Sequence, residues 1–342
     1  MHFKAVFGAA LLALGATSVQ AADHEFKLHH FLGEKAPAHS KMLVPWAKQV
    51  EENSGGKVSI EIYPAMTLGG RPPELINQVR DGVVDLVWTV NGYTPGLFPR
   101  SEVFELPGVH KNDTAATNLA LKELFESDLK DDYKGVEVMF LHVHAGQGIH
   151  MRDTEVRSVA DLKDKKIRIP TRTGAWVIEA LGASPVAMPV PELPPALQKG
   201  VIDGAMIPWE IIPPLKIQEQ TNYQIEGADK ERFGTTVFQV SMNKDRWDSL
   251  PEDVQIAFRD ASDAAWSKEV GDIWAGADDF GIGLAVKAGN THITLTPEET
   301  AEFNTALEPV VGRWVEEVSS KGIDGSALVD KARAAVANNA SN

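Results

Sequence analysis

The sequence has 342 residues, of which 43% are hydrophobic and 24% are charged, a composition typical of a globular protein of about two domains. The 33 lysines and arginines are outnumbered by 48 aspartates and glutamates, and the resulting net charge of −15 argues against nucleic acid as a partner because it repels phosphate. Cysteine is absent, which excludes disulfides, thiolate metal sites, iron–sulfur ligation and a cysteine nucleophile.

The first 21 residues have the pattern of a signal peptide. Lys4 precedes an apolar run from Ala5 to Ala16, and Val19 and Ala21 place small residues three and one before a cleavage point. As a helix this run spans roughly 18 Å, less than the ~30 Å of a hydrocarbon core. No later stretch of the sequence reaches 18 apolar residues. We therefore expect export with removal of residues 1–21 and no stable membrane insertion.

The next part of the chain alternates strands with helices. Apolar residues at every second position predict strands over 26–31, 58–63 and 83–88, and apolar residues at helical spacing predict helices over 37–53 and 72–81. Strands that alternate with helices build a parallel, doubly wound sheet.

A second set of α/β units follows a loose segment at 145–148. Before this segment the predicted elements are a helix over 113–125 and a strand over 136–144. After it they are strands over 167–169, 186–188, 202–207 and 235–242, helices over 173–181 and 191–199, and an almost wholly helical region from 251 onward. Within that region, Gly281 and Gly283 are expected to interrupt a helix, and Trp274 is expected to pack in the core. Two α/β units with a flexible connection predict two lobes with a ligand cleft between them.

Signatures of enzymes and metal sites are missing from the sequence. His142 and His144 share one face of a strand and His150 follows, yet no carboxylate lies at ligand spacing. The sequence contains no His-Glu-x-x-His, no Walker-type loop, no dinucleotide fingerprint and no Gly-x-Ser-x-Gly elbow. We therefore expect no metal, no cofactor and no catalytic residues.

Three stretches, 159–170, 181–192 and 196–204, carry a more specific pattern. They read Val-Ala-Asp-Leu-Lys-Asp-Lys-Lys-Ile-Arg-Ile-Pro, Leu-Gly-Ala-Ser-Pro-Val-Ala-Met-Pro-Val-Pro-Glu and Ala-Leu-Gln-Lys-Gly-Val-Ile-Asp-Gly. This pattern resembles the DctP-type solute-binding proteins of tripartite ATP-independent periplasmic (TRAP) transporters. The similarity extends from about residue 26 to residue 320.

The resemblance implies a monomeric periplasmic receptor with a two-lobed, class II binding-protein fold, which captures a small solute and delivers it to TRAP transporter membrane subunits. Its lobes would close about a hinge, with a long C-terminal helix as a brace. The implied division is residues 22–144 plus 234–270 for the first lobe, residues 145–233 plus 271–342 for the second, and chain crossings near 145–148, 233–234 and 266–274.

Arg168 occupies the position of the family's carboxylate-binding arginine. A guanidinium is planar, permanently charged and able to donate two parallel hydrogen bonds to a carboxylate. The alternative is an arginine bonded to backbone or to an acidic neighbour. Arg172 is expected to be solvated. Some relatives carry a second arginine in the segment that here runs from His144 to Gly148, and its absence argues against dicarboxylates and sugar acids.

The other candidate ligand contacts are aromatic and polar side chains at strand ends and in the loops behind them. They are Trp88, Asn91, Tyr93, His144, Gln147, Trp209, Glu210 and Phe238. The aromatic members favour a monocarboxylate with an apolar or aromatic part. For Trp88 the alternative is a core position, and for Glu210 it is a cap of the following helix.

Two other functions stay open on the sequence alone. The first is a receptor for a small amine or zwitterion held by Glu210 and by aromatic faces. The second is a secreted hydrolase or isomerase that uses the same cleft, which would need a nucleophile or an acid–base pair that the sequence does not identify.

Overall fold

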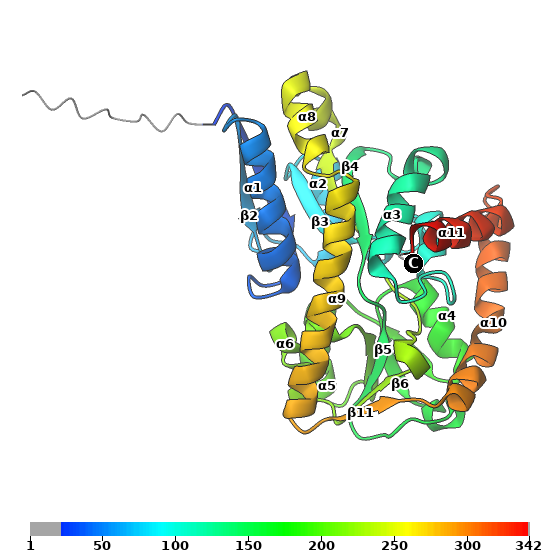
Figure 1. Ribbon diagram of the computed structural model, residues 1–342. Coiled ribbons are helices and arrows are strands. Elements are labelled where there is room, and N and C mark those ends of the chain that lie inside the picture. The colour runs from blue at the N-terminus through cyan, green and yellow to red at the C-terminus, as the bar shows by residue number, and fades with distance from the viewer. Residues whose placement is uncertain (1–21, 341–342) are drawn as a thin grey trace, which may run out of the picture.

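Two β-sheets with helices packed around them organise the chain (Figure 1). The computed structural model describes residues 22–340, so the predicted signal peptide lies outside the described residues. The first sheet has the order β2-β1-β3-β10-β4 and the second has the order β11-β9-β5-β8-β6-β7. The strands are β1 (His24–His30), β2 (Val58–Tyr63), β3 (Leu86–Val90), β4 (Val136–Val143), β5 (Gly148–Met151), β6 (Lys166–Ile169), β7 (Ser184–Ala187), β8 (Gly204–Ile207), β9 (Tyr223–Glu226), β10 (Val237–Asn243) and β11 (Thr291–Thr294). The predicted two-lobed α/β architecture is confirmed.

Both sheets are mixed, whereas the sequence predicts parallel ones. Strand β1 pairs in parallel with β2 and β3, but β10 runs antiparallel to β3 and β4. In the second sheet, β5 is antiparallel to β8 and β9. The reversed strands are β10, which enters the first sheet from the second, and β5, which enters the second sheet from the first. Each starts at the edge where its neighbours end.

The α-helices cover both sheets and form the C-terminal part. They are α1 (Val44–Asn53), α2 (Leu75–Arg80), α3 (Thr114–Leu124), α4 (Arg172–Ala180), α5 (Leu193–Gln198), α6 (Ile212–Leu215), α7 (Lys244–Asp248), α8 (Glu252–Asp260), α9 (Ala264–Lys287), α10 (Pro297–Ser319) and α11 (Gly325–Asn339). Side chains at several helix starts accept a hydrogen bond from a free backbone N–H, which explains where these helices begin. Such caps are Asp113, Thr171, Asp263, Thr296 and Asp324.

The strand predicted over 83–88 begins later, at Leu86. The backbone N–H groups of Val83 and Val84 both donate to the carbonyl of Gln78, so these residues belong to the turn that ends α2. Gly82 makes this turn with a positive φ of 71°, a conformation that glycine adopts without steric penalty.

Helix α9 is the predicted brace, because it packs against α3 beside the first sheet and against the turn Trp209–Ile211 beside the second (Figure 1). The expected interruption at Gly281 and Gly283 is wrong, since the helix is continuous from Ala264 to Lys287. Gly281 instead permits close packing: a Cβ there would lie 2.0 Å from the Trp209 carbonyl oxygen. Gly283 has open space around it.

The last helix does not follow the predicted division of the chain into lobes. Helix α10 packs against α4 beside the second sheet, whereas α11 packs mainly against α3 beside the first. The apolar face of α11, with Leu328, Val329, Ala332 and Val336 buried, is evident in the sequence, but an apolar face does not specify its partner. Among residues 22–340, no helix combines the length and the apolar character that a membrane crossing requires.

Candidate functional site

A cavity lies between the two sheets, where strands from both of them end. Together with its part open to solvent, it contains about 410 Å³ of space free of protein atoms. Its lining residues are Phe31, Leu32, Trp88, Val90, Tyr93, His144, Gln147, Arg168, Pro170, Val190, Ile207, Pro208, Glu210, Ile211, Thr236, Phe238 and Trp274. The ends of β3, β4, β6 and β8 and the start of β10 supply most of this lining, as expected for a ligand site in an α/β fold.

One wall of the cavity is built from parallel aromatic rings. The Trp88 ring stacks on Phe31 at a centroid distance of 4.7 Å and on Phe238 at 5.2 Å, with interplanar angles of 12° and 2°. Trp274 from α9 lies 6.4 Å from Trp88 at 20°. Trp88 is both a core residue and a lining residue, and its indole N–H donates to His142 Nε2 at 2.8 Å. Such a wall is suited to a planar apolar group.

Arg168 brings a buried positive charge to this cavity. The residue is 2% exposed, and its guanidinium donates from Nε to the Met188 carbonyl at 3.0 Å and from one terminal nitrogen to the Met206 carbonyl at 3.3 Å. Burial lowers the pKa of Arg168, and the neighbouring Tyr93 hydroxyl opposes this shift, but a guanidinium stays charged in proteins. Within residues 22–340, no acidic side chain forms an ion pair with Arg168. This buried cation therefore has no counter-ion in the described part of the chain, which leaves it able to pair with an anion in the cavity.

His144 and Gln147 add neutral polar groups from the link between β4 and β5. His144 Nδ1 accepts from the Gly146 backbone N–H at 3.0 Å, so the neutral ring carries its proton on Nε2. Burial lowers the pKa of His144 well below its ordinary value, and nearby positive groups add to the shift. The Gln147 amide donates to Thr236 Oγ1 at 2.9 Å, which leaves the Gln147 carbonyl oxygen buried without a partner in the described part of the chain.

Glu210 places a carboxyl group in the lining. The residue is 4% exposed, and its Oε2 has no hydrogen-bond partner among the described residues. Burial and the nearby Asp278 carboxyl raise the pKa of Glu210 well above its ordinary value, while its own backbone N–H and Arg232 act in the opposite direction. The surroundings therefore favour the protonated form of this carboxyl group. It does not cap a helix, because the following turn has no side-chain cap.

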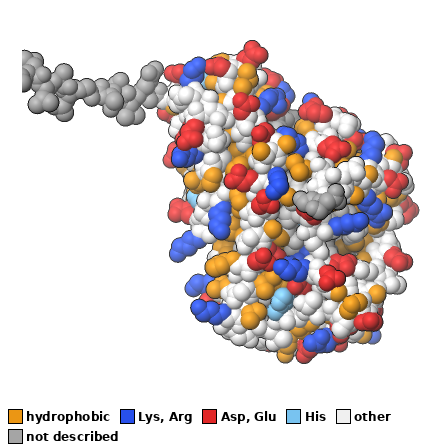
Figure 2. All heavy atoms as spheres, viewed as in Figure 1, with side chains coloured by type: hydrophobic (Ala, Val, Ile, Leu, Met, Phe, Trp, Pro, Cys, Tyr) orange, Lys and Arg blue, Asp and Glu red, His pale blue; other side chains and the backbone are white. Residues whose placement is uncertain are grey.

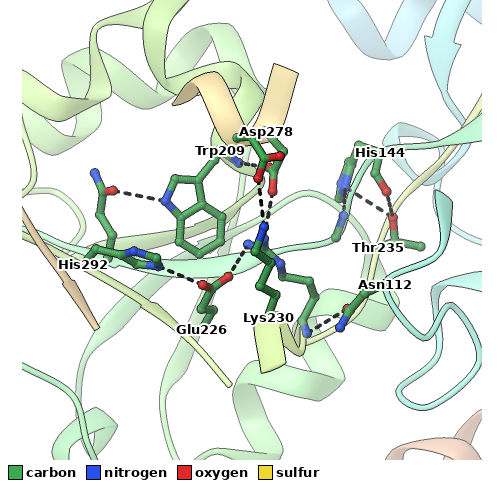
Figure 3. A network of polar contacts seen from close by, with 12 residues as sticks. Asn112, His144, Trp209, Glu226, Lys230, Thr235, Asp278 and His292 are labelled. Atoms are coloured by element: carbon green, nitrogen blue, oxygen red, sulfur yellow. Dashed lines mark hydrogen bonds and ion pairs between the residues drawn. The ribbon is translucent and has the colours of Figure 1, made fainter. Parts of the chain in front are cut away.

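Behind Glu210, a second buried arginine is fully neutralised. Arg232 lies between Glu226 at 2.9 Å and Asp278 at 2.8 Å, with its guanidinium carbon 4.2 Å from the centre of the Trp209 ring (Figure 3). Asp278 also accepts from the Trp209 backbone N–H at 2.8 Å. Because two carboxylates already pair with this cation, Arg232 is not available to an anionic ligand.

Seven of the nine residues singled out from the sequence are lining residues, and Asn91 and Trp209 are not. The Trp209 indole N–H donates to Gln224 Oε1 at 3.1 Å, and its ring is fully buried. Asn91 donates to the Tyr133 hydroxyl and accepts from the Gln239 amide, both at 2.7 Å. The polar groups of both side chains are thus used within the protein.

The sequence analysis did not single out the other ten lining residues, which include the aromatic Phe31 and Trp274. Phe31 ends the first predicted strand, and the rule that ligand sites lie at strand ends would have identified it. Trp274 sits in a helix with apolar residues on most sides, so nothing in the sequence distinguishes it from a core tryptophan. The three histidines do not form a metal site, since no metal-binding group of His, Asp and Glu is found among residues 22–340.

Contacts across the cavity rim hold the two halves together. Arg172 donates to both carboxylate oxygens of Glu102 at 2.6 Å and to Glu317 at 3.0 Å, and it is not solvated as predicted. The Tyr93 hydroxyl accepts from the Val190 N–H at 2.9 Å. Residues 93 and 102 follow β3 of the first sheet, and residues 172 and 190 follow β6 and β7 of the second, so these contacts join the two sheets across the cavity rim.

On the face shown in Figure 2, acidic and basic side chains are interspersed. The cavity differs from this mixed surface, because a buried cation, Arg168, lies in its lining.

Comparisons with known proteins agree with this geometry. The model of the family described as "Bacterial extracellular solute-binding protein, family 7" matches residues 28–317. The chain is 39% identical to a marine metagenome TRAP solute-binding protein specific for aromatic acid ligands, solved with metahydroxyphenylacetate, with a TM-score of 0.90 over 93% of this chain and 99% of that one. It is 37% identical to a TRAP solute-binding protein from Rhodoferax ferrireducens T118 solved with copurified benzoate, with a TM-score of 0.89 over 92% and 98%.

A more distant relative binds a different kind of solute. The ectoine/5-hydroxyectoine-binding periplasmic protein UehA of Ruegeria pomeroyi is 26% identical, and the alignment covers 98% of this chain and 96% of that protein.

Proposed function

The chain belongs to the extracellular solute-binding protein family 7, whose members bind small solutes for TRAP transporters, and we propose that its solute is an aromatic monocarboxylate. The observation that carries the proposal is Arg168, a buried cation without a protein counter-ion, beside the stacked rings of Phe31, Trp88 and Phe238. The carboxylate would pair with the guanidinium and the ring would lie against the aromatic wall.

The charge of the cavity supports a single negative charge on the solute. Arg168 contributes one positive charge, while burial lowers the pKa of His144 and raises that of Glu210, which disfavours the charged form of both groups. A dicarboxylate would bring a second negative charge that only Arg232 could balance, and Arg232 is already paired with two acids. The solutes named for the two relatives at 39% and 37% identity, an aryl acetate and benzoate, are monocarboxylates.

The same charges disfavour the amine or zwitterion interpretation. A bound ammonium group needs an ionised carboxylate, and Glu210 would have to lose its proton in a buried site beside Asp278. The alternative is nevertheless a distinct outcome of the experiment below, since one relative is an ectoine-binding protein.

We further propose that closure occurs about the two segments 145–148 and 233–234, with lobes divided as the sequence predicts apart from α11. These segments pair with each other, because Gln147 N–H donates to the Gly234 carbonyl at 2.8 Å and Phe233 N–H donates to the Gln147 carbonyl at 3.0 Å. Gly146 and Gly234 have φ values of 99° and 120°, which only glycine adopts readily. Paired segments with such glycines can absorb the backbone rotation of a hinge.

Calorimetric titration of the purified protein tests the solute class. Benzoate and phenylacetate are expected to bind, whereas succinate and ectoine are not. At a concentration of about 100 times its dissociation constant, a bound acid should raise the free energy of unfolding by ~2.7 kcal/mol. Binding of ectoine or succinate without binding of either aromatic acid would refute the proposal.

We propose that the protein is a receptor without catalytic activity, and that residues 1–21 are removed on export to the periplasm. Benzoate incubated with the protein overnight should be recovered unchanged, as measured by mass spectrometry. More than one molecule of product per molecule of protein would identify an enzyme. N-terminal sequencing of the periplasmic protein should begin at Ala22. A retained Met1 would contradict the proposed cleavage.

A further inference from the structure

The Tyr93 hydroxyl lies where the two halves of the cavity meet. Tyr93 follows β3 of the first sheet, lines the cavity and is 9% exposed. Its oxygen accepts from the Val190 backbone N–H at 2.9 Å and lies beside the Arg168 guanidinium. Val190 and Arg168 both belong to the second half. Both groups that face this hydroxyl from the second half are therefore hydrogen-bond donors.

These neighbours leave the proton of the Tyr93 hydroxyl without an acceptor. A tyrosine hydroxyl can donate one hydrogen bond as well as accept, whereas a backbone N–H and a guanidinium only donate. Among residues 22–340, the hydrogen bond from Val190 is the only one recorded for the Tyr93 hydroxyl. Buried donors in native proteins are nearly always paired. The hydroxyl is therefore free to donate to a molecule bound in the cavity.

Arg168 has unused donor capacity beside this hydroxyl. Its guanidinium donates from Nε to the Met188 carbonyl and from Nη1 to the Met206 carbonyl, and Nη2 makes no hydrogen bond within the described residues. Carboxylate oxygens only accept hydrogen bonds, and each has two lone pairs. One carboxylate can therefore accept from Arg168 and from the Tyr93 hydroxyl at the same time.

We propose that the Tyr93 hydroxyl donates a hydrogen bond to the same solute carboxylate that pairs with Arg168. This inference rests on the proposed function and assigns Tyr93 as a second carboxylate-binding residue. Because Tyr93 follows a strand of the first sheet and Arg168 lies in a strand of the second, one carboxylate is held from both sides of the cavity. The charged group of the solute then joins the two halves, while its ring lies against the aromatic wall.

Tyr93→Phe removes the hydroxyl and keeps the ring. A hydrogen bond to a charged group is worth about a factor of ten or more in affinity, so the dissociation constant of benzoate in calorimetry should rise about 10-fold or more. Tyr223→Phe is the matched control, since it removes the same atom from a tyrosine outside the lining and should leave the constant unchanged. Thermal unfolding without benzoate checks that both variants are folded.

Tyr93→Phe also removes the acceptor of the Val190 N–H, so a second variant separates the two roles of the hydroxyl. In Tyr93→3-fluorotyrosine the fluorine withdraws electrons, which makes the hydroxyl a stronger donor and a weaker acceptor. Measured at about pH 6, where the hydroxyl keeps its proton, donation to the carboxylate predicts about 2-fold tighter binding of benzoate. An acceptor of the Val190 N–H alone predicts weaker binding. Tyr93→3-fluorophenylalanine compared with Tyr93→Phe gives the effect of the fluorine itself, which is subtracted.

The two proposals fail in different ways. If neither benzoate nor phenylacetate binds the wild type, the proposed function is wrong. If benzoate binds the wild type and Tyr93→Phe equally well, the function stands and the inference is refuted. A fluorotyrosine variant that binds benzoate no more tightly than the wild type, after the subtraction, also overturns it. Weaker binding in Tyr93→Phe together with tighter binding in the fluorotyrosine variant supports the inference.

Discussion

Replacing Arg168 with methionine removes the positive charge of the cavity while keeping an unbranched side chain. The expected result is a loss of aromatic-acid binding from a protein that still folds. In the wild type the guanidinium donates two hydrogen bonds to backbone carbonyls and has no acidic partner among residues 22–340. Losing those bonds costs about 1 kcal/mol each, and removing a buried charge without a partner acts in the opposite direction. The free energy of unfolding without ligand should therefore change by no more than about 2 kcal/mol.

The effect on binding is larger, because the carboxylate of the solute would be buried without its partner. Removing one member of a buried charge pair at a binding site costs about 2–5 kcal/mol, which corresponds to a weakening of roughly 30-fold to several thousand-fold. A concentration of benzoate that stabilises the wild type by ~2.7 kcal/mol should then stabilise the variant by less than about 1 kcal/mol.

Thermal unfolding with and without benzoate measures this difference. Arg313→Met is the matched control, since Arg313 forms an exposed ion pair with Glu179 far from the lining residues. The control should gain as much stability from benzoate as the wild type does. If Arg168→Met also retains the full gain, the carboxylate binds elsewhere and the assignment of Arg168 is wrong.

Three further predictions concern packing, pH and closure. Gly281→Ala places a methyl group against the Trp209 carbonyl and should lower the free energy of unfolding by about 1–3 kcal/mol, whereas Gly283→Ala has room and should not; equal melting temperatures would contradict the packing argument. Burial raises the pKa of Glu105 to about 7, above its unfolded value near 4.5. The protonated side chain therefore contributes fully to the free energy of unfolding below about pH 4.5, and this contribution is lost as the pH rises through 7. In denaturant titrations, the free energy of unfolding of the wild type minus that of Glu105→Gln should therefore be about 3 kcal/mol larger at pH 4.5 than at pH 8. A difference that does not change with pH would refute this. Arg172→Gln removes the ion pair with Glu102, which joins the two halves across the cavity rim, and should weaken benzoate binding by about 10-fold in calorimetry; an unchanged affinity would show that this pair does not contribute to closure.

Much of the fold could be predicted from the sequence, because strand alternation and helix spacing are local signals. The cap Asp113 marks a helix start in the sequence as in the structure, whereas the helix predicted from residue 173 begins one residue earlier, after the cap Thr171. Strand direction and the partner of α11 depend instead on how distant segments meet. The amphipathic pattern of α11 is compatible with packing on either half, so its position beside α3 required the structure.

For the site, sequence reasoning reached the residues at strand ends and missed those whose role depends on distant partners. Apart from the family pattern that singles out Arg168, Arg168 and Arg232 look alike in the sequence, since each is an arginine at the edge of a strand or hinge. They differ because Arg232 meets Glu226 and Asp278 in space, 6 and 46 residues away in the chain. Trp209 is an equivalent case, because its burial depends on close packing against Gly148 and Gly281.

A crystal structure of the protein with benzoate tests the central claim most directly. The account predicts the carboxylate oxygens within about 2.9 Å of the Arg168 guanidinium, with the ring against Trp88 and Phe238. Benzoate bound at another place, or Arg168 turned away to pair with a carboxylate of the protein, would contradict it.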